Sequence, residues 1–278
     1  MTSTGRHTEH GDRRVALAGE ILRTVVGSGV HGIAIPGMDD HDEMGVFIEP
    51  AAQVLGLRRP LDHYVYRTQP EGARSGPGDT DLVIYSLRKY LRLATKGNPT
   101  VLLPFFAPKR DVLILTELGA ELRALAPAAL SRRAVHRFLG YMEAQRQRLT
   151  GEGPSRRVPA RPELVARYGY DVKYASHALR LAYQGLEVAR AGRLTLPMPE
   201  PERERVLEVK RGEVTDVADV LTEIAGIQRQ IDELLDSGRT PLPAEPDLDT
   251  IEQWSVSAHR RFWNWAQSTI PQPGHATQ

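Results

Sequence analysis

The chain has 278 residues, 41% of them hydrophobic, which is enough for one large core or two modest ones. Its 36 Lys and Arg residues balance 35 Asp and Glu residues, so the net charge of +1 does not indicate a general nucleic-acid coat, although local basic faces are compatible with it. The absence of cysteine excludes disulfides, thiolate metal sites and cysteine nucleophiles. No apolar run reaches the roughly 20 residues of a membrane span, and we expect a cytoplasmic protein without a membrane partner.

The first third of the chain alternates short β-branched runs with turn signals, a pattern that predicts strands. Such runs lie at residues 23–26, 44–48, 64–66 and 81–84. A stretch rich in Pro and Gly at 70–78 predicts a loop between the last two strands.

From Tyr85 onward the apolar spacing becomes helical, and Gly97-Asn98-Pro99 ends the first of these helices. Further helices are predicted at 112–126, 131–149, 163–192 and 215–235, and a last one carries Trp254, Phe262, Trp263 and Trp265. We therefore expect disordered tails at 1–12 and 269–278, an α/β domain at 13–107 and an all-helical domain at 108–268.

The chemically informative stretch runs from Gly27 and Ser28 to Asp40 and Asp42, just ahead of a predicted strand. Alternate side chains of an extended chain share a face, so Asp40 and Asp42 project together. Two adjacent carboxylates are costly unless a cation neutralises them, and Mg²⁺ prefers carboxylate oxygens with substrate phosphates completing its shell. Gly27 allows close backbone approach to a ligand, and Ser28 adds a hydroxyl. The alternative is a solvated acidic turn, since runs of charge usually lie in loops.

The order of these motifs resembles the DNA polymerase β-like nucleotidyltransferases, in which Gly-Ser, a spacer and Asp-x-Asp lead into a strand. The chain is most similar to an uncharacterised subgroup associated with RNA repair. The matching motifs are Gly27-Ser28-Gly29-Val30-His31-Gly32, Gly45-Val46-Phe47-Ile48, the strand-helix junction at 81–93, Gly97-Asn98-Pro99, and Gly169-Tyr170-Asp171-Val172-Lys173 with His177 and Arg180. The resemblance covers about residues 20–235 and implies an α+β fold: a mixed sheet with flanking helices, followed by an all-helical region.

The same resemblance implies a third carboxylate from a later strand, which is Asp81, with Asp79 two residues earlier as the alternative. Asp40, Asp42 and Asp81 would then be the catalytic residues and the metal ligands. The implied ion is Mg²⁺, with Mn²⁺ as an alternative, and Gly27 and Ser28 would hold the triphosphate of an NTP.

A helix at 171–187 places Lys173, His177, Arg180 and Gln184 on one face, away from its apolar face. A solvated face explains this pattern equally well. The resemblance instead implies that Lys173, His177 and Arg180 bind the nucleotide, with the two cations neutralising phosphates and the imidazole contacting a phosphate or the attacking group.

Two other basic groups and the tryptophans have simpler interpretations. Arg88, Lys89, Arg92 and Lys96 form a stripe that we expect to face solvent, with strand binding as the alternative. Arg156, Arg157 and Arg161 lie in a Pro/Gly-rich loop, which either folds over a polyanionic substrate or is simply mobile. We expect the tryptophans to be core residues rather than stacking platforms for bases.

The resemblance implies transfer of a nucleotidyl group from an NTP to an acceptor hydroxyl, such as an RNA end, with release of pyrophosphate.

Relatives carry a Glu shortly after Asn-Pro, whereas this chain continues from Asn98-Pro99 into Thr100. That departure motivates a second hypothesis, a non-catalytic nucleotide- or RNA-binding module. A third is a protein-modifying nucleotidyltransferase of the antitoxin type, although such proteins are usually shorter. The sequence leaves the acceptor and the oligomeric state open.

Overall fold

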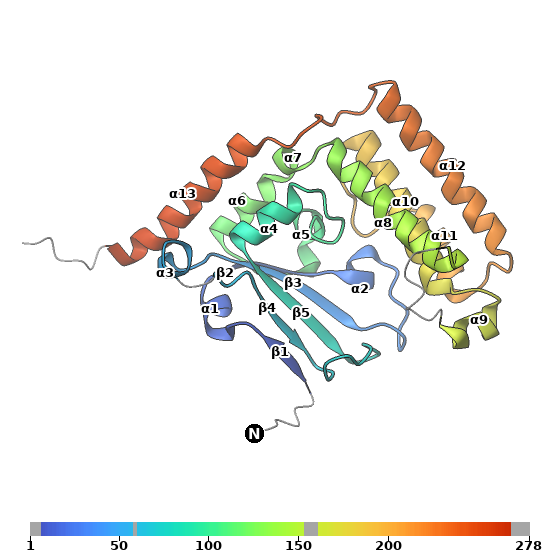
Figure 1. Cartoon of the computed structure of the whole chain (residues 1–278), viewed down its shortest axis with the longest axis horizontal. Helices are drawn as coiled ribbons and strands as arrows, with labels where there is room; N and C mark the ends of the chain where they lie inside the picture. The colour runs from blue at the N-terminus through green and yellow to red at the C-terminus, as the bar shows by residue number, and fades with distance from the viewer. Residues whose placement is uncertain (1–6, 58–59, 153–160, 268–278) are drawn as a thin grey trace, which may run out of the picture.

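The computed structural model describes residues 7–57, 60–152 and 161–267, and its N-terminal part is a six-stranded sheet (Figure 1). The strands are β1 Thr8–His10, β2 Glu20–Val25, β3 His41–Phe47, β4 His63–Arg67, β5 Thr80–Ser86 and β6 Val112–Leu115. They lie in the order β1-β4-β5-β3-β2-β6. Strands β3 and β5 pair in parallel while the other neighbours pair antiparallel, so the sheet is mixed.

Helices flank the sheet and then form the rest of the described chain (Figure 1). They are α1 Arg13–Ala18, α2 Gly27–His31, α3 Ala51–Val54, α4 Leu87–Ala94, α5 Leu103–Phe106, 3-10 helix η1 Lys109–Asp111, α6 Glu117–Ala124, α7 Ala126–Ala129, α8 Arg132–Thr150, α9 Pro162–Tyr168, α10 Val172–Ala191, α11 Glu202–Arg211, α12 Val217–Asp236 and α13 Leu248–Gln267. This is the expected α+β fold, a mixed sheet with flanking helices followed by a helical region. None of the helices in the described ranges is both long and apolar enough to cross a membrane.

Alternation along the strands gives the sheet two apolar faces. Met44 and Val46 of β3 point into the larger core, which continues under α4, α6, α8, α10 and α12. Phe47, one residue further, points to the opposite face and joins a small cluster with Ala16 of α1. The larger core therefore connects the sheet to the helical region, and α1 closes part of the second face.

Helix α10 is the central element of the helical region, since α8, α11 and α12 all pack against it. Helix α13 returns toward the sheet and contacts α4 and α7. It is anchored just after β3 by two bonds to Glu49: the His259 ring nitrogen lies 3.2 Å from the Glu49 carboxylate, and Trp263 donates to the Glu49 carbonyl oxygen at 2.8 Å. Trp254 packs against the core, as expected, and donates to Glu121. The side chain of Trp265 lies outside the described part of the chain.

Two sequence expectations about the edges of the sheet are wrong. Residues 112–126, expected as a helix, form β6 and α6, and β6 pairs with β2. An unbroken apolar run does not distinguish strand from helix, and the free backbone groups of β2 decide the outcome. The sheet thus takes a strand from beyond the boundary expected at 107/108; the division into two domains remains a prediction.

The N-terminal residues 8–10, expected to lie in a disordered tail, form β1 on the other edge of the sheet. The Thr8 hydroxyl donates to the carbonyl oxygen of Gln69 at 3.0 Å, and Tyr64 donates to Glu9 at 2.7 Å. A strand of three polar residues has no periodicity to detect, because its stability comes from these tertiary contacts. Residues 1–6 and the expected tail at 269–278 lie outside the described residues.

The helix expected at 163–192 is divided into α9 and α10. Gly169 adopts φ +82° and ends α9, because this left-handed conformation is favourable for glycine. Asp171 then caps α10, accepting from the backbone N–H groups of Lys173 and Tyr174 at 3.0 and 3.1 Å. The cap sets the start of the helix whose basic face is described below.

We predict that Asp171→Ala destabilises the protein more than the same change at another helix cap. Asp171 is buried, also accepts from the Arg161 N–H and pairs with the Arg161 guanidinium at 3.2 Å, so its removal leaves three backbone N–H groups and a guanidinium unsatisfied. The expected loss is about 2 kcal/mol in the free energy of unfolding, measured by urea denaturation. Asp216 caps α12 from an exposed position, and Asp216→Ala should cost about 1 kcal/mol or less. Equal losses in the two variants would contradict this account.

Candidate functional site

Three carboxylates meet where β3 and β5 begin. One oxygen each from Asp40, Asp42 and Asp81 lies within 4.8 Å of the other two, the sole grouping of this kind among the described residues. Parallel pairing places Asp42 directly opposite Asp81, and Asp40 precedes β3. Asp79 does not join them: its carboxylate accepts from the Gly76 N–H and the Thr68 hydroxyl, each at 2.9 Å, and stabilises the turn before β5. The structure thus brings together the three carboxylates expected to bind metal.

The charges of this cluster are unevenly compensated. Burial, and then the neighbouring charges of Asp40 and Asp81, raise the pKa of Asp42 to about 6. Burial also raises the pKa of Asp81, but hydrogen bonds from Arg67, Gln69 and Ser75 outweigh it, so that pKa is lowered overall. Arg67 donates to both oxygens of Asp81, at 3.0 and 2.7 Å. Arg67 therefore neutralises Asp81, whereas Asp42 forms no ion pair with any residue in the described ranges.

The turn after β2 fits closely around Asp42. Gly27 adopts φ +64°, and a Cβ atom there would collide with the Asp42 carboxylate, so only glycine is compatible with this position. The Asp42 carbonyl oxygen accepts from the Val26 N–H at 2.9 Å, which holds the turn against β3. The Ser28 hydroxyl is buried, and among the described residues it has no hydrogen-bond partner. A buried polar group of this kind indicates a position for a ligand atom.

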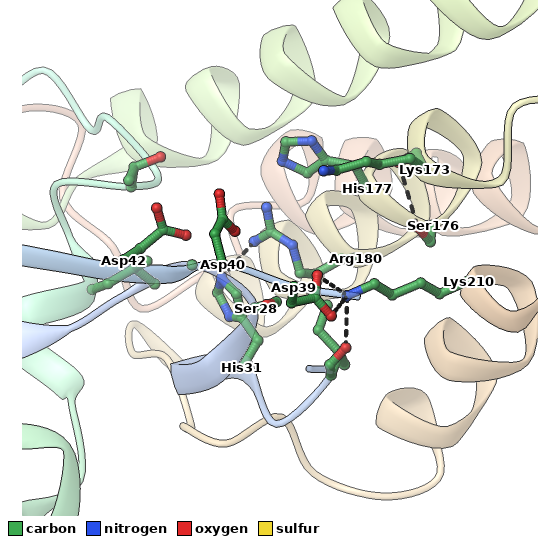
Figure 2. A pocket seen from close by; sticks show the side chains of 14 residues that line it. Ser28, His31, Asp39, Asp40, Asp42, Lys173, Ser176, His177, Arg180 and Lys210 are labelled. Atoms are coloured by element: carbon green, nitrogen blue, oxygen red, sulfur yellow. Dashed lines mark hydrogen bonds and ion pairs between the residues drawn. The ribbon is translucent and has the colours of Figure 1, made fainter. Parts of the chain in front are cut away.

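The carboxylates open onto a cleft of about 290 Å³ between the sheet and the helical region (Figure 2). Gly27, Ser28, Asp40 and Asp42 line one side, together with Thr100. Helices α10 and α11 line the other. Their contribution consists of Lys173, Ser176, His177, Arg180 and Lys210.

The basic face expected on α10 therefore points into the same cleft as the carboxylates. Lys173, His177 and Arg180 are separated by four and three residues, which places them on one side of the helix. In Figure 2 the Lys173 ammonium extends toward the carboxylates. Cations on one wall and carboxylates on the other suit a ligand that carries both phosphates and a metal ion.

Arg180 is fixed by His31 of α2, on the sheet side, and by Gln184 of its own helix. It donates to the Nε2 atom of His31 at 2.9 Å and to Gln184 at 2.7 Å. A guanidinium has no acceptor, so Nε2 of His31 carries no proton. Burial, and then the charge of Arg180, lowers the pKa of His31 well below its ordinary value, which keeps the ring neutral. Burial lowers the pKa of Arg180 to about 10, so it stays charged at neutral pH.

His177 differs from its two basic neighbours. Burial, and then the charges of Arg180 and Lys173, lower its pKa to about 3. The imidazole is therefore neutral near pH 7 and brings a hydrogen-bonding group, not a charge, to the cleft. The positive charge of the α10 wall comes from Lys173 and Arg180.

Lys210 completes the wall, and the sequence did not point to it. Its ammonium donates to both oxygens of Asp39 at 2.9 Å and to the carbonyl oxygen of Ile33 at 2.8 Å. This ion pair ties α11 to the segment that ends at Asp40. In the sequence, Asp39 is one of several adjacent acidic residues, and Lys210 lies 171 residues away with no motif around it. His31 lies within the glycine-rich motif at 27–32. The buried contacts of both residues become evident only from the tertiary structure.

The other basic groups lie away from this cleft. Lys89 and Arg92 face Asp62 at 3.9 and 3.4 Å, which supports the expected solvent-facing role of that stripe. Arg161 pairs with Asp171 at 3.2 Å, so it supports the α10 cap. Arg156 and Arg157 lie outside the described residues. Thr100, which directly follows Asn98-Pro99, forms part of the cleft wall.

Comparison with known proteins adds the family. A nucleotidyltransferase-like protein from Exiguobacterium sibiricum, known from a crystal structure, aligns with 94% of this chain and with 78% of its own chain. The sequence identity is 10% and the TM-score is 0.30, so no argument rests on this similarity. No curated protein matches the sequence. The model of the RNA repair pathway DNA polymerase beta family matches residues 13–257. Because this match spans most of the chain, including every residue that lines the cleft, the protein belongs to the RNA repair pathway DNA polymerase beta family.

Proposed function

We propose that the protein is a metal-dependent nucleotidyltransferase that moves a nucleotidyl group from an NTP to an acceptor hydroxyl and releases pyrophosphate. Family membership suggests nucleotidyl transfer in general. One observation carries the more specific proposal: Asp40 and Asp42 face the cations Lys173 and Arg180 across one cleft, and Asp81 joins the two aspartates in the carboxylate cluster. A metal-bound triphosphate needs both kinds of group.

The carboxylate cluster fits a divalent cation. Its donors are all oxygen atoms, which Mg²⁺ prefers and Mn²⁺ accepts. The raised pKa of Asp42 reflects a charge without a counter-ion, which a bound cation would supply. Asp40, Asp42 and Asp81 would hold the ion, and when bound it would favour ionisation of the acceptor hydroxyl and stabilise the charge that develops on the transferred phosphate.

The remaining residues of the cleft would bind and orient the nucleotide. The unpartnered hydroxyl of Ser28 is available to donate to a phosphate oxygen beside the open backbone at Gly27. Lys173 and Arg180 would compensate the triphosphate charge, and neutral His177 would donate or accept one hydrogen bond. Lys210 is already paired with Asp39, so we assign it to holding the Asp40 segment in place.

A non-catalytic nucleotide-binding module is the second candidate. The observation that favours it is the run from Asn98-Pro99 into Thr100, which brings no carboxylate to the cleft wall, whereas the resemblance implies a Glu shortly after Asn-Pro. Binding of NTP without transfer to any RNA or protein acceptor would support this candidate over the enzyme.

We predict that Asp40→Asn combined with Asp42→Asn abolishes Mg²⁺-dependent transfer of label from α-labelled NTPs, and with it pyrophosphate release. Amide side chains lack the charge that holds the cation. The matched control is Asp232→Asn with Asp236→Asn, the same two changes on exposed positions of α12, which should leave turnover unchanged. Undiminished turnover in the Asp40/Asp42 variant would refute the assignment of the metal site.

We also predict that Asp42→Asn stabilises the metal-free protein at neutral pH. A group whose pKa is raised in the folded state contributes stability below its unfolded value, here 3.8, and loses it as the pH rises through about 6. Asparagine does not titrate, so the Tm of the variant minus that of the wild type should grow between pH 4 and pH 7. At neutral pH the variant should gain on the order of 1 kcal/mol in the free energy of unfolding after solvent screening, which corresponds to a few degrees in Tm.

The measurement is thermal unfolding in EDTA across this pH range. Added Mg²⁺ should raise the Tm of the wild type and have less effect on the variant. A Tm difference that stays constant with pH would show that the ionised Asp42 carboxylate does not destabilise the metal-free protein.

A further inference from the structure

A second hollow lies on the Asp81 side of the carboxylates. It measures about 360 Å³ and shares Gly27, Asp42 and Thr100 with the first cleft, so the two meet at Asp42. The cations Lys173 and Arg180 line only the first cleft. If the NTP phosphates bind among those cations, the second hollow is the open position next to the reacting phosphate, where an acceptor has to lie.

The floor of this hollow is apolar and aromatic. Val65 and Val83 are register partners on β4 and β5, and Tyr85 follows on the same face of β5. All three side chains are only partly buried. Four residues of strand separate Asp81 from Tyr85, or about 13 Å at the usual rise per residue. Such a floor suits flat, uncharged rings that lie one after another away from the carboxylates.

Tyr85 is in turn close to α8. Burial raises its pKa, and the nearby Tyr141 of α8 adds to this effect. The Tyr141 hydroxyl accepts from the Asn98 side chain at 3.2 Å, while its ring is 38% exposed. The Asn98 side chain that donates to Tyr141 also accepts from the backbone N–H of Thr100, which lines the second hollow, so Tyr141 lies close to that hollow.

Tyr141 belongs to an exposed row on α8 that we call the α8 track. The track consists of Arg133, Arg137, Tyr141 and Arg148. Their spacing of four or seven residues keeps them on one side of the helix. At one end, Arg133 and Arg137 line a hollow of about 320 Å³ with Lys96 and His136. At the other, Arg148 is close enough to contribute to the low pKa of His177 in the first cleft.

The charge of the α8 track is largely uncompensated. Arg133 pairs with Glu245 at 2.5 Å, but no carboxylate in the described part of the chain forms an ion pair with Arg137 or Arg148. Exposed arginines often do no more than face solvent. Here, however, they share one helix face with the exposed ring of Tyr141, which lies close to a hollow with an aromatic floor beside the carboxylate cluster. Surfaces that bind single-stranded nucleic acids combine cations spaced along the phosphate backbone with aromatic rings that stack on the bases.

We propose that the acceptor is a single strand of nucleic acid that lies along the α8 track and over Tyr85 and Val83, with its terminal hydroxyl at Asp81. This inference rests on the proposed function, because it identifies the hydroxyl that receives the nucleotidyl group. The phosphates contact Arg137 and Arg148, and the last bases stack on Tyr141 and Tyr85. In the transfer, the acceptor oxygen forms a bond to the α-phosphorus, the bond to pyrophosphate breaks, and the proton of the hydroxyl is lost to solvent.

The test is binding of a fluorescein-labelled single-stranded RNA of ten nucleotides, followed by anisotropy in EDTA without NTP. Arg137→Ala and Tyr141→Ala should each weaken binding about tenfold, which is the effect of one lost phosphate contact or one lost stacking contact. Arg137→Ala should also lower the slope of log Kd against log salt by about one, while Tyr141→Ala leaves that slope unchanged.

The matched control is Arg229→Ala, which removes an exposed arginine from α12 and should bind RNA like the wild type. Far-UV circular dichroism and Tm confirm that each variant is folded. Equal affinities for all three variants would overturn the proposal. A single-stranded DNA of the same sequence, run in parallel, distinguishes the two kinds of strand.

Two further outcomes separate this inference from the proposed function. If the variants weaken RNA binding but the wild type transfers no nucleotide to any acceptor, the α8 track stands and the proposed function fails. If the wild type transfers nucleotides to a protein acceptor, and Arg137→Ala and Tyr141→Ala leave that transfer unchanged, the proposed function stands and the α8 track fails.

Discussion

The pairing of β3 with β5 is the constraint on which the site depends. Parallel register sets Asp42 directly opposite Asp81, and no shift of one residue is tolerated because it would turn Met44 and Val46 out of the core. The apolar face of β3 thus enforces the proximity of two like charges. The fold accepts that repulsion in part by placing Arg67 against Asp81, which leaves Asp42 as the uncompensated member.

The helical region supplies the positive charge that the sheet side of the cleft lacks. A sheet edge with three carboxylates has no means of attracting a phosphate, and the cations of α10 reverse the sign of the field a short distance away. Neutral His31 and His177 occupy the space between charged neighbours without adding to the positive charge. The cleft is therefore divided by charge, and its acidic and basic walls come from the two halves of the chain.

The sequence predicts the main outline well where local signals are strong. The strands β2 to β5, the long helices α8 and α12, and the α+β order follow from β-branched runs and helical spacing. Residues Asp40, Asp42 and Asp81, together with the basic face of α10, were all expected and all reach one place. Strands β1 and β6 were missed because they are short, and only pairing with an existing edge makes them strands. Lys210 and the proton state of His177 depend on burial between distant segments, which no local pattern encodes.

The ion pair between Lys210 and Asp39 has a consequence for the entropy of binding. Together with the bond from Arg180 to His31, it joins the helical wall to the sheet wall at two partly buried points. Pulling the walls apart would expose unpaired charges, so the spacing between carboxylates and cations is set before any ligand arrives. A ligand that enters such a preorganised cleft pays little to order the protein around it, and more of its contact energy remains available for affinity and alignment.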